Sequence, residues 1–275
     1  MRKRTDVPVD SEAKTAGGHD RQFITALHRG LEVLRAFRPD DRAGLSNGDI
    51  SERTGLPNST ISRLTYTLLK SGYLLYDNDT GRYRMGVPVL SLGYACLSGL
   101  PVRETSQNYM QELANECGEG VQVALGGRVD YTMIYLATAR SRSVISLQLD
   151  VGSRISLARS AMGRAYIAAC GAEEKEEILA SIRDHAAPED WPALRDGIAQ
   201  AAEEIASRGF YANLGDWQPN VHSVAVPFRS YKGGDTPLLA FNLGGPANYL
   251  PKDKLVGEFG PKLRELVKTL EQSMI

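Results

Sequence analysis

Residues 45–74, "LSNGDISERTGLPNSTISRLTYTLLKSGYL", have the spacing of two short helices separated by a tight turn. Ser46 is placed to cap the first helix, in which Ile50 is the inward apolar residue. Gly55 predicts the end of that helix, because glycine adopts the left-handed conformation that follows many helix C-termini. Pro57 suits the first turn of the second helix. The apolar residues of the second helix recur at helical spacing: Ile61, Leu64, Leu68 and Leu69.

The segments on either side complete a small domain. Upstream, residues 25–37 place four apolar residues at spacings of three and four, which predicts a helix with one inward face. These residues are Leu27, Leu31, Leu34 and Phe37. Downstream, residues 73–86 place β-prone residues around an Asp-Asn-Asp-Thr-Gly turn, which predicts a β-hairpin. Helix, short helix, helix and hairpin in this order predict a winged helix-turn-helix domain over residues 22–86.

The second helix of the pair begins with polar and hydroxyl side chains. In a helix-turn-helix this end of the second helix enters the major groove of DNA. Arg63 either donates to a guanine or holds a phosphate, and the sequence leaves both open. A helix that only fills a core also begins with such residues, but the preceding short helix, the turn and the basic hairpin favour DNA binding. The candidate DNA-binding residues are Asn58, Ser59, Thr60, Ser62, Arg63, Arg82 and Arg84.

Composition narrows the class of protein. The first 100 of the 275 residues hold 14 Lys and Arg against 11 Asp and Glu, and the remainder holds 18 against 22, so the front permits nucleic-acid binding. Three cysteines without a CxxC pair indicate reduced thiols in a cytoplasmic protein. Four scattered histidines suggest no metal site, and no cofactor is expected. No apolar run has the roughly 18 residues of a membrane span. Residues 1–21, rich in charge, Pro and Gly, predict a disordered tail.

The rest of the chain predicts a second domain. Residues 87–101 are apolar on every side, which indicates a linker helix that packs against a partner. Within residues 102–275, strand-like runs joined by tight turns alternate with blocks of helix, so we expect an α+β fold with helices on an antiparallel sheet. The expected strands are residues 121–127, 131–137, 143–149, 210–215, 223–229 and 238–245, and the last helix is expected over 252–274.

Several stretches together resemble the IclR family of bacterial transcriptional regulators. They are "FITALHRGLEVLRAF", the stretch quoted first, "GRYRMG", "VGSRISLARSAMGRAYIAA", "SRGFYANLGDWQPNVHSVAVPF" and "LAFNLGGP". They occur in family order and cover the chain from Gln22 to its end. The resemblance implies a winged helix-turn-helix joined by a linker helix to a GAF-like effector-binding domain. It also implies a homodimer or dimer of dimers on double-stranded operator DNA, which a two-fold protein makes pseudopalindromic.

The resemblance places the effector between residues 152–163 and the last strands. A helix that begins beside a sheet offers free N–H groups to a carboxylate, although tight helix–sheet packing explains the same small residues. Ser156 and Ala158 depart from the Pro and His usual in the family. Arg159 replaces an uncharged residue and is either a ligand for an acidic effector or a surface charge. The effector-site candidates are Val144, Leu147, Ile155, Arg159, Ala161, Asn213, Val221, Ser223, Asn242 and Gly244.

Catalysis is not expected. Common hydrolase, metalloprotease and nucleotide-binding motifs are missing from the sequence. His222 and Ser223 are adjacent, so on a strand they point to opposite faces and cannot act as base and nucleophile. The sequence therefore predicts a ligand-responsive transcriptional regulator that senses a small organic acid, aromatic acids included. The alternative is a dimeric architectural DNA-binding protein without an effector. The compound, the promoter, the direction of regulation and the choice between dimer and tetramer stay open.

Overall fold

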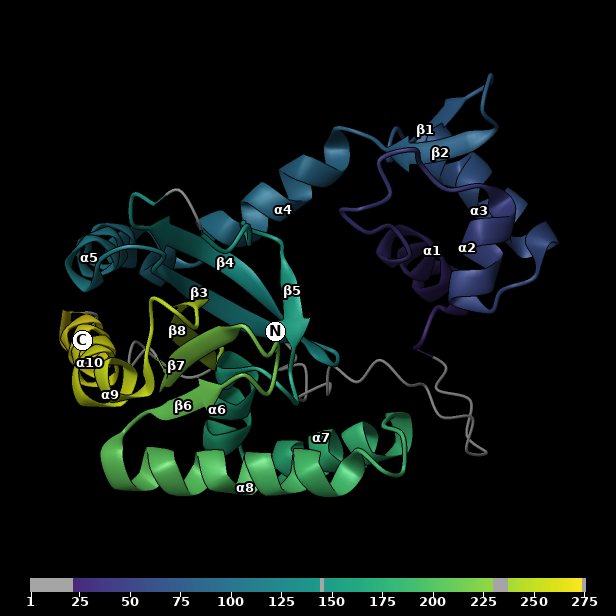
Figure 1. Ribbon diagram of the computed structural model, residues 1–275. Coiled ribbons are helices and arrows are strands. Elements are labelled where there is room, and N and C mark those ends of the chain that lie inside the picture. The colour runs from purple at the N-terminus through teal and green to yellow at the C-terminus, as the bar shows by residue number, and fades with distance from the viewer. Residues whose placement is uncertain (1–21, 144–145, 230–236, 274–275) are drawn as a thin grey trace, which may run out of the picture. The chain divides into compact units, whose positions relative to one another are not determined.

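The computed structural model describes residues 22–143, 146–229 and 237–273, which form two compact units, one ending at Gly99 and one beginning at Leu100 (Figure 1). The predicted tail over residues 1–21 and the effector candidate Val144 lie outside the described residues. In the described part of the chain, no helix is long and apolar enough to cross a membrane.

The front unit is a winged helix-turn-helix, as predicted. Its elements are α1 (Thr25–Arg35), α2 (Asn47–Thr54), α3 (Asn58–Lys70), β1 (Leu74–Asp77), β2 (Arg82–Met85) and α4 (Pro88–Ser98). The strands β1 and β2 pair antiparallel as the wing. Leu45 adds a bridge to Tyr83 on β2, which ties the wing to the segment before α2. Buried apolar side chains from α1, α2, α3 and β1 form one small core: Val33, Ile50, Ile61 and Leu74.

Local chemistry fixes the two ends of α2. The Ser46 hydroxyl accepts a hydrogen bond from the Asp49 backbone N–H at 3.2 Å, and the Asp49 carboxylate accepts one from the Ser46 N–H at 2.9 Å. This reciprocal capping box satisfies two N–H groups at the helix start. Gly55 ends the helix with φ 68°, a left-handed conformation that glycine adopts without steric cost. The predicted cap and stop are confirmed.

The predicted inward face of α1 is wrong in part. Val33 is the fully buried residue of this helix, whereas Leu27 is 61% exposed and Leu31 is 48% exposed. The core of a unit this small has room for one side of α1 only. The apolar stripe of α1 is wider than that side, so the two leucines face outward, and Phe23 and Ile24 just before the helix are exposed as well.

The rear unit is built on one six-stranded sheet in the order β5-β4-β3-β8-β7-β6, with every pair antiparallel. The strands are β3 (Gln122–Val129), β4 (Thr132–Arg140), β5 (Arg154–Ser156), β6 (Tyr211–Leu214), β7 (Val221–Phe228) and β8 (Leu239–Pro246). The strand expected over residues 143–149 is wrong: its described residues form a loop, and β5 follows it. The loop is held by side chains, because Gln122 and Arg140 both donate to the Leu149 carbonyl.

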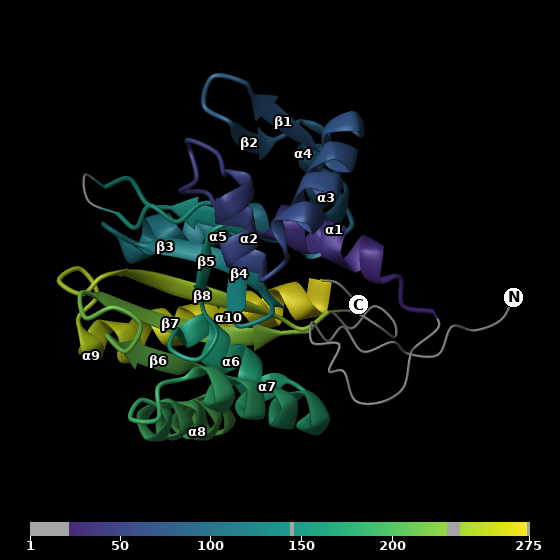
Figure 2. The same cartoon turned by 90° about the vertical axis from the view of Figure 1, so that its right-hand side faces the viewer.

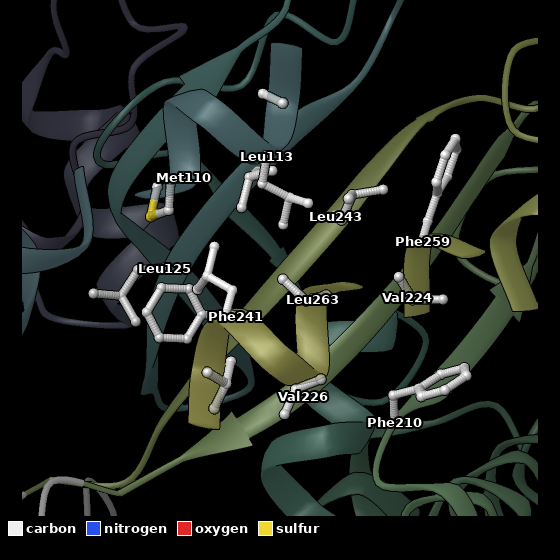
Figure 3. Packing of buried hydrophobic residues seen from close by; sticks show 14 of the residues in the cluster. Met110, Leu113, Leu125, Phe210, Val224, Val226, Phe241, Leu243, Phe259 and Leu263 are labelled. Carbon is white, nitrogen blue, oxygen red and sulfur yellow. The ribbon is translucent and has the colours of Figure 1, made fainter. Parts of the chain in front are cut away.

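Helices cover both faces of this sheet. They are α5 (Pro101–Cys117), α6 (Ala161–Ala169), α7 (Ala172–His185), α8 (Trp191–Arg208), α9 (Lys252–Lys254) and α10 (Gly260–Ser273), with a π-helical turn (Leu255–Phe259) before α10. On one face, Phe241 and Leu243 of β8 pack with residues of α5 and α10 (Figure 3). On the other face, α6 lies between the sheet and α8 (Figure 2). The α+β prediction is confirmed.

Candidate nucleic-acid interface and ligand site

The leading face of α3 is exposed and polar. Asn58, Ser59, Ser62 and Arg63 are exposed, and Thr60 is half-buried. The residue before the helix is a proline, and no side chain caps the helix start. The backbone N–H groups of the first turn are therefore free of a side-chain cap. Together with the positive end of the helix dipole, such N–H groups favour a phosphate. The start of α3 therefore presents backbone donors and small polar side chains on one surface.

Hydrogen bonds join α2 to α3 without involving the Arg63 side chain. Asn47 on α2 donates from its amide nitrogen to the Ser62 hydroxyl at 3.2 Å, and that hydroxyl donates to the Asn58 carbonyl at 3.0 Å. In the described part of the chain, the Arg63 side chain makes no hydrogen bond or ion pair. Ser62 therefore links the two helices, whereas the Arg63 guanidinium can reach a partner outside the chain.

Further along α3, three residues extend the same surface and were missed by the sequence prediction. Tyr66, Thr67 and Lys70 are exposed, and the Lys70 ammonium lies 5.6 Å from the centre of the Tyr66 ring. They follow Ser59 and Arg63 at helical spacing, so continuing the polar face by three and four residues would have found them. An aromatic ring and an ammonium at these positions suit contacts with the sugar-phosphate backbone.

The two wing arginines differ in what they contact. Arg82 donates to the Gly44 carbonyl at 2.8 Å and to the Asp49 carboxylate at 3.0 Å, so it joins the wing to α2. Hydrogen bonds from Ser46, helped by the nearby Arg82 guanidinium, hold the pKa of Asp49 below its usual value. Arg84 is more exposed, with its nearest carboxylate, that of Asp77, at 3.7 Å. Of the two, Arg84 is the cation available to a ligand.

In the rear unit, the sheet places a row of polar side chains on the face that α6 covers. Arg140 on β4 is opposite Gln122 on β3, and Gln122 is opposite Gly244 on β8. Gly244 in turn is opposite Ser223 on β7, and Ser223 is opposite Asn213 on β6. Residues directly opposite one another point to the same face. The row therefore crosses five strands, and Gly244 in its middle lets Ser223 pack closely, because a Cβ on Gly244 would lie 2.9 Å from the Ser223 Cβ.

A second row on this face holds Asn242. It is opposite Ala124 on one side and Ala225 on the other, so its neighbours are small. Burial raises the pKa of Tyr135 to about 12, against the opposing effect of the nearby Asn242 amide. Ala161, at the start of α6, packs against Ala225. Seven of the effector candidates lie on this face or above it: Ile155, Ala161, Asn213, Val221, Ser223, Asn242 and Gly244.

The other described candidates lie apart from this group. Leu147 is half-buried in the loop before β5, the edge strand that carries Ile155. Arg159 donates to the Asp190 carboxylate at 2.6 Å, and both side chains are nearly half exposed. Its backbone carbonyl accepts a hydrogen bond from the Asn213 amide at 2.8 Å. Arg159 thus contributes its backbone to the site, whereas its side chain is paired with Asp190.

One buried cation next to this face was also missed. The Arg164 side chain on α6 is only 3% exposed. It donates to the Tyr211 hydroxyl at 2.5 Å and to the Asp216 carboxylate at 2.5 Å, and to the Ala158 carbonyl at 2.9 Å. Gly197 on α8 makes room for the guanidinium, because a Cβ there would lie 2.5 Å from it. Arg164 therefore connects α6 with the edge strand β6 and with the loop that follows β6.

Comparison with known proteins assigns both units. The chain matches the IclR helix-turn-helix domain over residues 26–78 and the bacterial transcriptional regulator IclR C-terminal domain over residues 94–272. It is 28% identical over 252 residues to the HTH-type transcriptional regulator TsaQ1/TsaQ2 of Comamonas testosteroni. The matched stretch covers 92% of this chain and 89% of that protein.

Solved structures agree. The crystal structure of an IclR family transcriptional regulator from Brucella abortus has a TM-score of 0.84 and 39% identity, over 93% of this chain and 95% of that one. An IclR homolog from Microbacterium hydrocarbonoxydans, crystallised with 4-hydroxybenzoate, has a TM-score of 0.66 and 24% identity, over 90% of this chain and 98% of that one. The chain belongs to the IclR family of bacterial transcriptional regulators.

Proposed function

We propose that this regulator binds a pseudopalindromic operator as a homodimer or dimer of dimers and senses a small organic acid. The DNA-reading part is residues 22–86, the linker is 87–101, and the sensing part is 102–275. IclR-family regulators are DNA-binding proteins without enzymatic activity.

The exposed face of α3 supports operator binding. Its start has uncapped N–H groups, and its side chains are hydroxyls, an amide and an unpaired arginine. Phosphate contacts from the helix start position a protein on DNA, and side chains further along the helix contact the base edges. We assign Asn58, Ser59 and Thr60 to the phosphates and Arg63 to a base. Arg84 on the wing is assigned to a neighbouring phosphate.

The polar row beneath α6 is the observation that supports a ligand site. Gln122, Ser223 and Asn242 are buried on this face among apolar and small side chains, and the Gln122 and Asn242 side-chain oxygens have no hydrogen-bond partner among the described residues. Buried polar groups are costly unless they are hydrogen-bonded, so they are concentrated where a ligand or water meets them. The start of α6 adds backbone donors above the row. A relative of this fold was crystallised with 4-hydroxybenzoate, and we propose a small organic acid here.

Two exposed apolar surfaces support self-association. No residue of α4 is buried, and Val87, Leu90 and Tyr94 are each at least 66% exposed. The outward side of α1 adds Leu27 and Leu31. Contiguous apolar surface of this kind marks a protein–protein interface. A second copy of the chain is the partner that a two-fold operator requires.

Operator binding with and without a ligand tests the proposal. Purified protein is titrated onto labelled DNA that flanks its own gene, in the absence and presence of benzoate, hydroxybenzoates and short-chain acids. We expect a specific complex whose affinity changes with at least one acid. If the protein binds this DNA no better than random DNA, the operator proposal is wrong. If it binds specifically but no acid changes the affinity, the architectural alternative is favoured.

A further inference from the structure

Unpartnered buried polar atoms gather on the α6 face of the sheet. In the part of the chain that the structure describes, four buried side-chain N or O atoms have no hydrogen-bond partner. One is Asn47 Oδ1 in the front unit. The other three are Gln122 Oε1, Asn242 Oδ1 and Arg140 Nε, all in the rear unit. Gln122 is 2% exposed and Asn242 is 7% exposed, so bulk water does not supply the missing partners.

Strand register places the three atoms close together. Gln122 is directly opposite Arg140, which puts their Cβ atoms about 4.5–5.5 Å apart. Asn242 is opposite Ala124, two residues along β3 from Gln122, so it is the diagonal neighbour of Gln122 at about 7–8 Å. The three side chains therefore border one region of the α6 face. Gly244, which faces Gln122 from β8, adds no side chain between them.

Gln122 and Arg140 are held in place by hydrogen bonds of their other atoms. The Gln122 amide nitrogen donates to the Leu149 carbonyl at 2.5 Å. The same carbonyl accepts from an Arg140 terminal nitrogen at 2.7 Å, and that nitrogen also donates to Asp150. Asn242 is packed between Ala124 and Ala225 of the neighbouring strands. Hydrogen bonds therefore fix the orientation of the unpartnered Gln122 and Arg140 atoms, and burial confines that of Asn242.

The chemistry of the three atoms defines a complementary ligand. Two are amide oxygens, which only accept hydrogen bonds, and one is a guanidinium N–H, which only donates. A carboxylate without further polar groups satisfies the guanidinium alone. We propose that the effector of this chain is a hydroxy acid, with its carboxylate on Arg140 and hydroxyl donors to Gln122 and Asn242. This inference rests on the proposed ligand site and adds to it the chemical class of the ligand.

Matched pairs of acids test it, with purified full-length protein and calorimetric or thermal-shift titration. The pairs are benzoate with 3-hydroxybenzoate, 4-hydroxybenzoate and 3,4-dihydroxybenzoate, and butyrate with 3-hydroxybutyrate. A site that hydrogen-bonds a hydroxyl rejects the analogue without one. We expect at least one hydroxy acid to bind tenfold or more tightly than its partner. Equal affinities within every pair, or no binding by any acid, would overturn the inference and leave water as the partner of these atoms.

Two variants and a control assign the effect to these residues. Gln122→Leu removes one acceptor, while Leu149 keeps its hydrogen bond from Arg140, so we expect the variant to fold and to lose the preference for the hydroxyl. Asn242→Leu tests the second acceptor independently. Gln107→Leu is the control. This exposed glutamine on α5 donates to the Thr138 carbonyl of β4 at 3.1 Å, so its loss also removes one glutamine-to-carbonyl hydrogen bond. A preference unchanged in both Gln122→Leu and Asn242→Leu would also overturn the inference.

The same titrations separate this inference from the proposed function. Operator binding by the ligand-free protein does not depend on which acid is sensed. If benzoate and its hydroxylated partners change operator affinity equally, the regulator proposal holds and the hydroxy-acid inference fails. If the protein has no specific operator complex at all, the proposed function fails, whereas the hydroxyl preference is still measured directly by calorimetry.

Discussion

Arg63 is the residue on which the DNA-binding proposal makes its sharpest prediction. Its guanidinium has no partner among the described residues, so Arg63→Ala removes no internal contact. If Arg63 donates to a base, the variant should bind operator about 1–3 kcal/mol more weakly, with unchanged thermal unfolding. Fluorescence anisotropy with operator and random duplexes measures both affinities.

The control for this change is Arg195→Ala, an exposed arginine on α8 that pairs with the neighbouring Asp196. It removes the same charge from the rear unit and should leave operator affinity as it is. If Arg63→Ala lowers the affinity for operator and for random DNA by the same factor, Arg63 holds a phosphate. Wild-type affinity on both would remove it from the interface.

Single residues also show where sequence reasoning stops. The hydroxyl-rich start of α3 could be predicted, because helix periodicity separates its exposed side from its buried side. The role of Arg82 could not, because its partner Asp49 is 33 residues away and the wing must fold before they meet. Gln122 could have been noticed in the sequence, because it is a polar residue within an apolar strand. Its unpartnered oxygen depends on register, which the sequence does not state.

Among the elements, the loop before α2 is braced by an ion pair whose loss should be visible on acidification. Arg53 donates to both carboxylate oxygens of Asp41, at 2.6 and 2.8 Å. These hydrogen bonds hold the pKa of Asp41 below its unfolded value of 3.8. The pair therefore stabilises the fold fully above about pH 4 and is lost as the pH falls through the lower folded pKa.

We expect acidification below pH 4 to destabilise the wild-type front unit more than Asp41→Asn, which is already less stable at pH 7. Both tryptophans, Trp191 and Trp217, are in the rear unit. Urea unfolding seen by circular dichroism but not by tryptophan fluorescence therefore belongs to the front unit. Asp40→Asn, which removes a neighbouring carboxylate without this ion pair, is the control. An identical pH dependence in Asp41→Asn and wild type would contradict the brace.

The linker helix α4 carries the prediction on assembly. With no buried residue of its own, it gains burial only from a partner. Replacing Leu90 and Leu97 with Asp places charges on that surface, so the variant should be monomeric in sedimentation and should lose operator binding. Ala180→Asp with Ala206→Asp, at exposed positions on α7 and α8, adds the same charge elsewhere. A Leu90 and Leu97 variant that still forms dimers would place the interface on another surface.

The sequence predicted helices and strands correctly where a local signal is strong. It failed where side chains distant in the sequence hydrogen-bond to the backbone. Ser46, Gly55 and the hairpin turn each define an element boundary within a few residues, and all three boundaries were found. Residues 143–149 alternate like a strand, but the Leu149 carbonyl is taken by Gln122 and Arg140. On α1, two leucines predicted to face the core are exposed. A sequence pattern identifies an apolar helix face but not the surface against which that face packs.

At the scale of the whole molecule, the two units are separate compact bodies. If the rear unit senses an acid as proposed, sensing and DNA binding are coupled by a difference in free energy between two arrangements, to which the effector and the operator each contribute. Coupling of this kind is reciprocal. The factor by which an acid changes operator affinity must equal the factor by which operator DNA changes the affinity for that acid.

The double change Ser223→Ala and Asn242→Ala tests the sensing end of this coupling. Both side chains are buried on the α6 face, on the adjacent strands β7 and β8. Each hydrogen bond to a ligand typically contributes about 0.5–1.5 kcal/mol, so losing both should weaken acid binding about tenfold or more. Operator affinity without acid should stay at the wild-type value, because these residues belong to the rear unit.

Linkage makes the double variant decisive. If the two side chains contact the acid equally in both arrangements, the variant needs more acid but reaches the same change in operator affinity at saturation. If they contact it in one arrangement only, the saturating change itself shrinks, and the effect of operator DNA on acid affinity shrinks by the same factor. Anisotropy for the operator and calorimetry for the acid measure both factors. A variant with wild-type acid affinity and a wild-type response would remove Ser223 and Asn242 from the ligand site.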